Sequence, residues 1–138
     1  MNITAPAPRA KDRDLPIVVV EDEETVLSFL ENSLKTSGYR NVHACSDQAS
    51  ALQRLQDVPE GPVALIIDVA LRTDNGIELA TRLLHERPAA RVLLISGFID
   101  ELVLPTGATE EKRVAFLPKP FNFRQFSEQF ERLLSNSI

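Results

Sequence analysis

Short apolar runs alternate along the chain with segments in which hydrophobic residues recur every three or four positions. The runs are rich in Val, Ile and Leu and give way abruptly to polar residues, which is typical of strands. They predict five strands, at about Leu15–Val20, Asn41–Cys45, 63–68, Arg91–Ile95 and Val114–Leu117. The third run stays apolar until it ends in Asp68, so it indicates a central strand that is buried on both faces.

Segments with helical periodicity follow most of these strands. They predict helices at about Glu24–Ser37, after Ser46 or Asp47, after Asn75 and from about Asn122. Gly38 stands where a left-handed residue is expected to end the first helix, and Asn75 and Glu78 have the spacing of a capping box. The phenylalanines of the last helix recur at helical spacing, so we interpret them as core residues rather than as a partner groove.

The alternation of strands and helices predicts an α/β fold. Its short connections favour a parallel sheet with right-handed crossovers and with helices on both faces. We expect one domain at residues 15–138, preceded by a disordered leader at residues 1–14 that contains Pro6 and Pro8. A chain of 138 residues buries roughly 68% of its unfolded surface, so its core needs neither disulfides nor a structural metal.

The segment from Ser96 to Arg113 carries a weak helical signal. Pro105 and Gly107 interrupt it, and its second half is polar. We predict at most one or two helical turns near Asp100–Leu104, followed by an irregular segment, because isolated helices below roughly 12 residues are marginal.

Composition excludes several classes of protein. A net charge of −5 without a basic cluster argues against nucleic-acid binding, and no segment has the length and apolarity of a membrane span or signal peptide. Cys45 is the only cysteine, which fits a reducing cytoplasm. We interpret it as a small core residue of the second strand. His43 and His85 have no partner at catalytic or metal-ligand spacing, and we assign them no role.

Polar side chains stand where the predicted strands end. Glu21 and Asp22 follow the first strand, and Asp68, Ser96 and Lys119 end or follow the third, fourth and fifth. Because parallel strands end at one edge of their sheet, three carboxylates, a hydroxyl and an amine are expected there, at the edge where such sheets bind ligands. Alone, Asp68 could be a nucleophile, a metal ligand or a helix cap. The other side chains also have ordinary interpretations, such as helix-terminal charges, a loop hydroxyl and a solvated amine.

Taken together, these strand ends resemble the response-regulator receiver domain. The matching segments are Val-Val-Val-Glu-Asp, Ile-Ile-Asp, Leu-Ile-Ser-Gly-Phe and Leu-Pro-Lys-Pro-Phe, and the resemblance covers about Leu15 to Leu134. Each motif alone is weak, but their order and placement are specific in combination. The resemblance implies a flavodoxin-like doubly wound sheet of five parallel strands in the order 2-1-3-4-5. It also implies a signalling helix in the segment that we expect to be short or irregular.

The resemblance also implies a reaction. Asp68 would accept a phosphoryl group from a histidine kinase or a histidine phosphotransfer protein. Such a transfer needs positioned cations more than acid–base groups. Asp22, Asp68 and the backbone carbonyl of Ala70 would bind Mg²⁺, with Glu21 acting mostly through its waters, since Mg²⁺ prefers oxygen ligands and retains water.

Further roles follow from the same resemblance. Lys119 would pair with the phosphoryl oxygens, and the Ser96 hydroxyl would donate a hydrogen bond to them. Ser96 and Phe116 would form the conformational switch that signals to a downstream protein. The Lys119–Pro120 peptide would be cis, an isomer that proline makes accessible. The chain would catalyse its own phosphorylation and dephosphorylation rather than act as a conventional enzyme.

Several positions depart from the usual family pattern. Glu21 replaces a more frequent Asp, and Arg72 stands where a proline is common. Ala70 and Phe98 occupy variable positions that help to set the rate of phosphoryl loss in relatives. Phe116 replaces an aromatic residue that is often tyrosine, so a switch here would lack the phenolic hydroxyl.

Two other hypotheses remain open at this stage. The chain could be a pseudo-receiver, or an isolated receiver of the hybrid-kinase type, that binds partners without phosphorylation. The segments Ser-Gly-Phe at 96–98 and Pro-Phe-Asn-Phe at 120–123 resemble stand-alone and hybrid-kinase receivers. A Mg²⁺-dependent phosphohydrolase would want a second aspartate at position 70, which is alanine. We expect no output domain, because the predicted elements use the whole chain.

Overall fold

The computed structural model describes residues 8–9, 12–97 and 113–136. Within them, five parallel strands form one sheet in the order β2-β1-β3-β4-β5. The strands are β1 (Ile17–Val20), β2 (Val42–Cys45), β3 (Val63–Asp68), β4 (Ala90–Ser96) and β5 (Val114–Pro118). The helices are α1 (Glu24–Ser37), α2 (Gln48–Gln56), α3 (Gly76–Glu86) and α4 (Phe123–Ser135).

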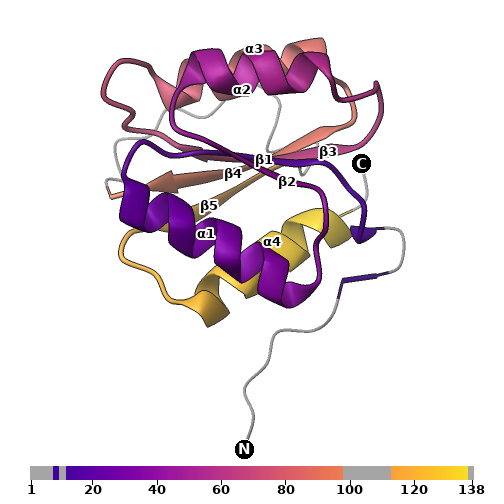
Figure 1. The fold of residues 1–138 in the computed structure, drawn as a ribbon, viewed down its shortest axis with the longest axis vertical. Coiled ribbons are helices and arrows are strands. Elements are labelled where there is room, and N and C mark those ends of the chain that lie inside the picture. The colour runs from indigo at the N-terminus through magenta and orange to yellow at the C-terminus, as the bar shows by residue number, and fades with distance from the viewer. Residues whose placement is uncertain (1–7, 10–11, 98–112, 137–138) are drawn as a thin grey trace, which may run out of the picture.

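The sheet separates two apolar cores (Figure 1). Helices α2 and α3 cover one face, and α1 and α4 cover the other. Successive strand residues point to opposite faces, so Val18 and Val20 pack in the first core and Ile17 and Val19 in the second. All six residues of β3 are buried, as expected for the central strand of a doubly covered parallel sheet.

Helix boundaries follow the capping residues seen in the sequence. Gly38 ends α1 with a φ of 109°, and its N–H donates to the carbonyls of Leu34 and Lys35. Asp47 rather than Ser46 is the N-cap of α2. Asn122 and Gln125 form a complete capping box at the start of α4, while Asn75 caps α3 by accepting from Ile77 and Glu78.

Strand boundaries differ from the predicted ones by one or two residues. The first strand begins at Ile17 rather than Leu15, because Pro16 has no N–H to donate to the ladder. The carbonyl of Pro16 still accepts from the N–H of Ala64 at 3.0 Å. The fourth strand extends to Ser96, which brings that side chain into the sheet itself.

Parts of the chain ahead of β1 contact the domain. The guanidinium of Arg9 donates to the Leu134 carbonyl, and the Arg13 carbonyl accepts from the N–H of Arg40. The disordered leader expected at residues 1–14 stays a prediction. The short helix expected near Asp100–Leu104, and Phe98, lie outside the described residues.

Three arginines bind helix C-termini at the amino edge of the sheet. Arg87 donates to the carbonyl of Leu55 in the last turn of α2 and to that of Val58 just after the helix. Arg91 donates to the carbonyls of Leu133 and Leu134 in α4. Arg113, which is 7% exposed, donates to the Leu84 carbonyl of α3. These guanidinium groups satisfy carbonyls that a helix end leaves unpaired. No helix in residues 12–97 and 113–136 is long and apolar enough to cross a membrane.

Candidate active site at the carboxyl edge of the sheet

The parallel register brings the predicted site residues to one edge of the sheet. Val20 pairs with Ile67, so Glu21 and Asp22 emerge beside Asp68 at the end of the central strand. Ser96 ends the neighbouring strand, and its carbonyl accepts from the N–H of Lys119 at 2.9 Å. Residues far apart in the sequence therefore meet because their strands end together.

Lys119 is the cation of this edge. Its ammonium nitrogen lies 2.8 Å from Asp68 Oδ2 and 3.5 Å from Glu21 Oε2. Partial burial alone would lower the pKa of Lys119, but its hydrogen bond and attraction to Asp68, and then to Glu21, raise that pKa above its ordinary value. The amine is therefore charged at neutral pH. The Lys119–Pro120 peptide is cis, the isomer expected from the sequence.

Glu21 is a buried carboxylate with one unsatisfied oxygen. Its side chain is 1% exposed, and Oε1 accepts from the N–H of Glu23 at 3.0 Å. Among the described residues Oε2 has no hydrogen-bond partner. Burial, and next the neighbouring carboxyl of Asp68, raise the pKa of Glu21 to about 7. A bound cation would relieve this cost, because it would neutralise the crowded carboxylates.

The three carboxylates converge closely enough to hold a metal ion. Glu21, Asp22 and Asp68 each offer one oxygen, and these atoms lie within 4.8 Å of one another. All the donors are hard oxygens, which fits Mg²⁺ better than zinc. Glu21 also has a buried oxygen, Oε2, without a hydrogen-bond partner among the described residues, so the residues fit a divalent cation.

Backbone N–H groups fix two of the carboxylates. The N–H of Ala70 donates to Asp68 Oδ1 at 2.9 Å, and the N–H of Arg72 donates to Asp22 Oδ2 at 2.6 Å. The Arg72 guanidinium lies 4.0 Å from the same oxygen, but its side chain is 83% exposed. Arg72 therefore contacts the site mainly through its backbone.

Gly76 supports the site and is absent from the sequence-based set. It opens α3 directly against the strand end, and its N–H donates to the Val69 carbonyl at 3.1 Å. A Cβ at this position would lie 2.7 Å from the Cα of Val69 and closer still to the Asp68 carbonyl. Only glycine permits that approach. The Asn75-Gly76 pair carried the signal, since such pairs mark turns and close backbone contacts.

The two predicted switch residues lie on neighbouring strands. Ser96 is 4% exposed at the end of β4. Phe116 is half-buried in β5 opposite Leu94 and packs against the core beneath α2 and α3. Phe116 therefore lies within β5, whereas Lys119 follows the end of that strand.

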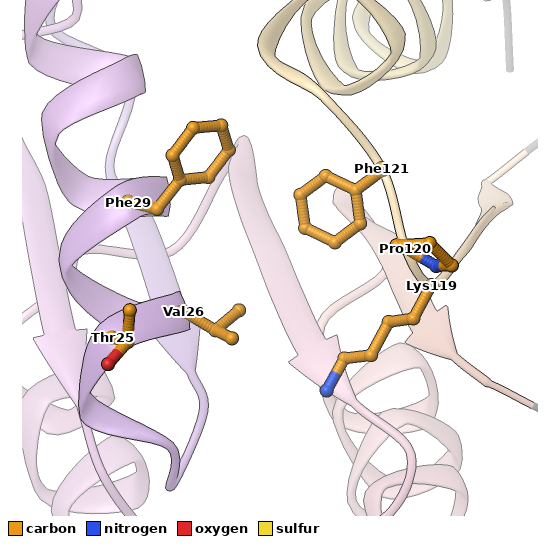
Figure 2. A pocket seen from close by; sticks show the side chains of 6 residues that line it. All are labelled: Thr25, Val26, Phe29, Lys119, Pro120 and Phe121. Carbon is orange, nitrogen blue, oxygen red and sulfur yellow. The ribbon is translucent and has the colours of Figure 1, made fainter.

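An apolar groove lies beside Lys119 (Figure 2). Thr25, Val26 and Phe29 of α1 form one wall, and Pro120 and Phe121 form the other, around a volume of about 520 Å³. The rings of Phe29 and Phe121 are 6.0 Å apart. Phe29 is 38% exposed, the only large hydrophobic residue in the described chain that is exposed to this degree.

Comparisons with known proteins cover the same elements. The family model of the response regulator receiver domain matches residues 17–131. The response regulator receiver protein CpdR of Brucella abortus (strain 2308) is 32% identical over 119 residues, which are 86% of this chain and 95% of CpdR. The alkaline phosphatase synthesis transcriptional regulatory protein PhoP of Bacillus subtilis (strain 168) is 30% identical over 125 residues, 88% of this chain and 49% of PhoP.

A solved structure gives a similar result. The receiver domain from the hybrid histidine kinase CckA superposes with a TM-score of 0.70 at 30% identity, and the match covers 87% of this chain and 99% of that domain. The range matched by the family model contains Glu21, Asp68 and Lys119.

Proposed function

Because the chain belongs to the response regulator receiver domain family, we propose that it accepts a phosphoryl group on Asp68 from a histidine kinase or a histidine phosphotransfer protein. The observation that carries the proposal is the 2.8 Å contact between Lys119 Nζ and Asp68 Oδ2 beside two further carboxylates. This arrangement combines a buried oxygen nucleophile with one cation, Lys119, and with carboxylates that could hold a second, as phosphoryl transfer requires.

Receiver domains typically bind Mg²⁺, and the acidic cluster supplies fitting ligands. In this proposal Asp22, Asp68 and the Ala70 carbonyl hold the ion, and Glu21 contributes through a bound water or through its unsatisfied Oε2. When bound, Mg²⁺ neutralises charge on the transferring group. Equivalent clusters of exposed acids without a ligand are common, so the buried Glu21 oxygen is the feature that favours a metal here.

The chain's own residues perform the transfer. A carboxylate oxygen of Asp68 attacks phosphorus in line, the phosphorus–nitrogen bond of the donor phosphohistidine breaks, and the imidazole leaves with that electron pair. The product is an acyl phosphate on Asp68. Lys119 pairs with a phosphoryl oxygen as a point charge, and the Ser96 hydroxyl donates a hydrogen bond to another.

Phosphorylation would then change the conformation of the domain. Ser96 moves toward the phosphoryl oxygens, and Phe116 repacks into the space next to it. Phe116 is half-buried and already contacts the core, so it can change rotamer without leaving apolar surroundings. The signal passes to a downstream protein that binds the altered surface.

The groove between α1 and residues 119–121 suits the phosphodonor protein. It is apolar, and Lys119 forms its end beside Asp68 (Figure 2). A helix seated in this groove would bring its phosphohistidine next to the acceptor. Histidine kinases present their phosphohistidine in the cytoplasm, and we expect this chain to act there.

Labelling with acetyl phosphate tests the acceptor. Wild-type protein should incorporate acid-labile acyl phosphate only when Mg²⁺ is present. Asp68→Asn should not be labelled, although its fold should stay intact. Glu23→Gln is the matched control, because Glu23 is an exposed neighbour whose side chain makes no capping bond. Normal labelling of Asp68→Asn would refute the assignment, and an unlabelled wild type would favour a phosphorylation-independent module.

Direct titration with Mg²⁺ tests the ligand set. Asp22→Asn should weaken Mg²⁺ binding far more than Glu23→Gln does, because only Asp22 contributes to the cluster. Equal losses in the two variants would count against these ligands.

A further inference from the structure

Asp74 links the loop after the acceptor strand to a different helix. Its Oδ2 accepts from the N–H of Gln48, the first residue of α2, at 3.1 Å and from the Thr73 hydroxyl at 3.2 Å. The partners Asp74 and Gln48 are 26 residues apart in the sequence. The bond therefore joins the loop between β3 and α3 to the start of α2, a helix that lies far from that loop in the sequence.

The contact is additional to the cap that α2 already has. Asp47 accepts from the N–H of Ser50 at 2.8 Å and so caps the helix from within its own segment. The N–H of Gln48 is one of the donors that a helix N-terminus leaves unpaired. Asp74 satisfies this donor from the β3–α3 loop, which holds the tip of that loop against α2.

The same loop contacts the acidic cluster at two places. Ala70 donates to Asp68, and Arg72 donates to Asp22. At its base the loop is closed by a bridge between Ala70 and Asn75. The base is therefore fixed by backbone pairing, whereas the tip is fixed by Asp74.

We propose that Asp74 is a positioning residue: by holding the loop tip on α2, it fixes the Arg72 N–H that orients Asp22. This inference rests on the proposed Mg²⁺ site. Mg²⁺ demands nearly ideal octahedral geometry, so a small displacement of its ligands weakens binding. Groups that orient metal ligands affect affinity without touching the ion.

Three variants separate this role from general stability and from charge. Asp74→Ala removes the acceptor and should raise the Mg²⁺ dissociation constant about tenfold. Asp74→Asn removes the charge but keeps an oxygen acceptor, so its Mg²⁺ affinity should stay near that of wild type. Gln48→Pro removes the donor and leaves the Asp74 charge in place; proline is tolerated at the first helical position. The extended backbone of Asp47, at φ −152° and ψ 172°, suits a residue before proline. Gln48→Pro should weaken Mg²⁺ binding as Asp74→Ala does.

Asp47→Ala is the matched control. It removes the other carboxylate that caps α2, so it should lower the melting temperature while leaving Mg²⁺ affinity unchanged. Mg²⁺ binding is measured from amide chemical shifts during titration of the folded, full-length protein. In wild type and Asp47→Ala, the Gln48 amide should shift on Mg²⁺ binding, and in Asp74→Ala that shift should disappear.

The outcomes distinguish failure of this inference from failure of the proposed function. A wild type that does not bind Mg²⁺ overturns the proposed metal site, and the positioning role with it. If wild type binds Mg²⁺ and either Asp74→Ala or Gln48→Pro binds it equally well, only the positioning role is overturned. Equal weakening in Asp74→Asn and Asp74→Ala would assign the effect to charge, and equal weakening in Asp47→Ala would assign it to loss of α2. Either result also overturns the positioning role.

Discussion

Lys119 Nζ lies 2.8 Å from Oδ2 of Asp68, and the lysine side chain is 29% exposed while that of the aspartate is 4% exposed. The buried carboxylate of Asp68 is thus paired with a cation that reaches it from the solvent side. In the absence of other cations, Lys119 offsets the repulsion among three converging carboxylates.

Replacing Lys119 should therefore change two measurements in opposite directions. Lys119→Gln should slow labelling by acetyl phosphate on the order of a hundredfold, because a charge that stabilises the transition state is lost. It should also tighten Mg²⁺ binding, because a competing cation has gone. Lys35→Gln, which removes an exposed lysine paired with Glu31, is the control and should change neither. Weaker Mg²⁺ binding in Lys119→Gln would contradict this account of the site.

Gly76 should be intolerant of any side chain. Gly76→Ala places a Cβ against the backbone of Val69, and relieving that clash should cost about 1–3 kcal/mol of unfolding free energy or more. Gly97→Ala is the control, because a Cβ there meets no atom within 4 Å. Urea denaturation of both variants gives the comparison, and equal stabilities would show that the close approach does not constrain the fold.

Phe29 should affect the rate of phosphoryl transfer from a protein donor but not from a small-molecule donor. Phe29→Ala removes the largest side chain from one wall of the groove, so it should slow phosphoryl transfer from the cognate kinase or phosphotransfer protein several-fold. Labelling by acetyl phosphate should not change, because Phe29 lines the groove and is not one of the carboxylates of the acidic cluster. Leu52→Ala, at a partly buried leucine on the opposite face of the sheet, should affect neither reaction. Slower labelling with both donors would point to a distorted site instead of a docking surface.

Tyr39 should make the domain sensitive to alkali. Burial, and next the charges of Asp12 and Glu131, raise the pKa of Tyr39 from 10.0 to about 12. Because the unfolded chain ionises at the lower value, Tyr39 favours the folded state fully below pH 10.0, and this contribution is lost as the pH rises to about 12. Tyr39→Phe should therefore reduce the loss of unfolding free energy over that range. Since Tyr39 is the only tyrosine, phenolate absorbance reports its ionisation directly, and an unshifted titration would exclude the effect.

The fold could be predicted because the apolar runs, the helical periodicity and the capping residues all indicate the same structure. The strand order 2-1-3-4-5 and the helices on both faces are confirmed, and so is membership of the receiver family. Capping residues predicted helix starts well, as at Asn122, because a side-chain oxygen there satisfies a specific backbone donor. Strand ends were less accurate, since the pattern of apolar residues does not show where ladder pairing begins.

Side-chain contacts between distant segments could not be predicted in the same way. The convergence of Glu21, Asp68 and Lys119 followed from the ends of their strands, but the burial of Glu21 depends on how neighbouring elements cover it. The bond between Asp74 and Gln48 had no sequence signal, because both residues are common in surface loops and helix starts. Arg113 is buried among backbone carbonyls at the end of α3 and the start of β4 although arginine is usually exposed, and only the packed structure supplies those acceptors.

The burial of β3 has a consequence for hydrogen exchange. Every residue of that strand is buried, and it pairs on one side with β1 and on the other with β4. Its amide protons are therefore expected to exchange with solvent only when the whole domain opens, whereas loops exchange through local fluctuations. Asp68 belongs to this slowest-exchanging strand, so the proposed acceptor has little freedom of its own. If Asp68 is the nucleophile, variation in phosphorylation rate among receivers with this core would arise from the surrounding loops, since this strand does not move independently of the sheet.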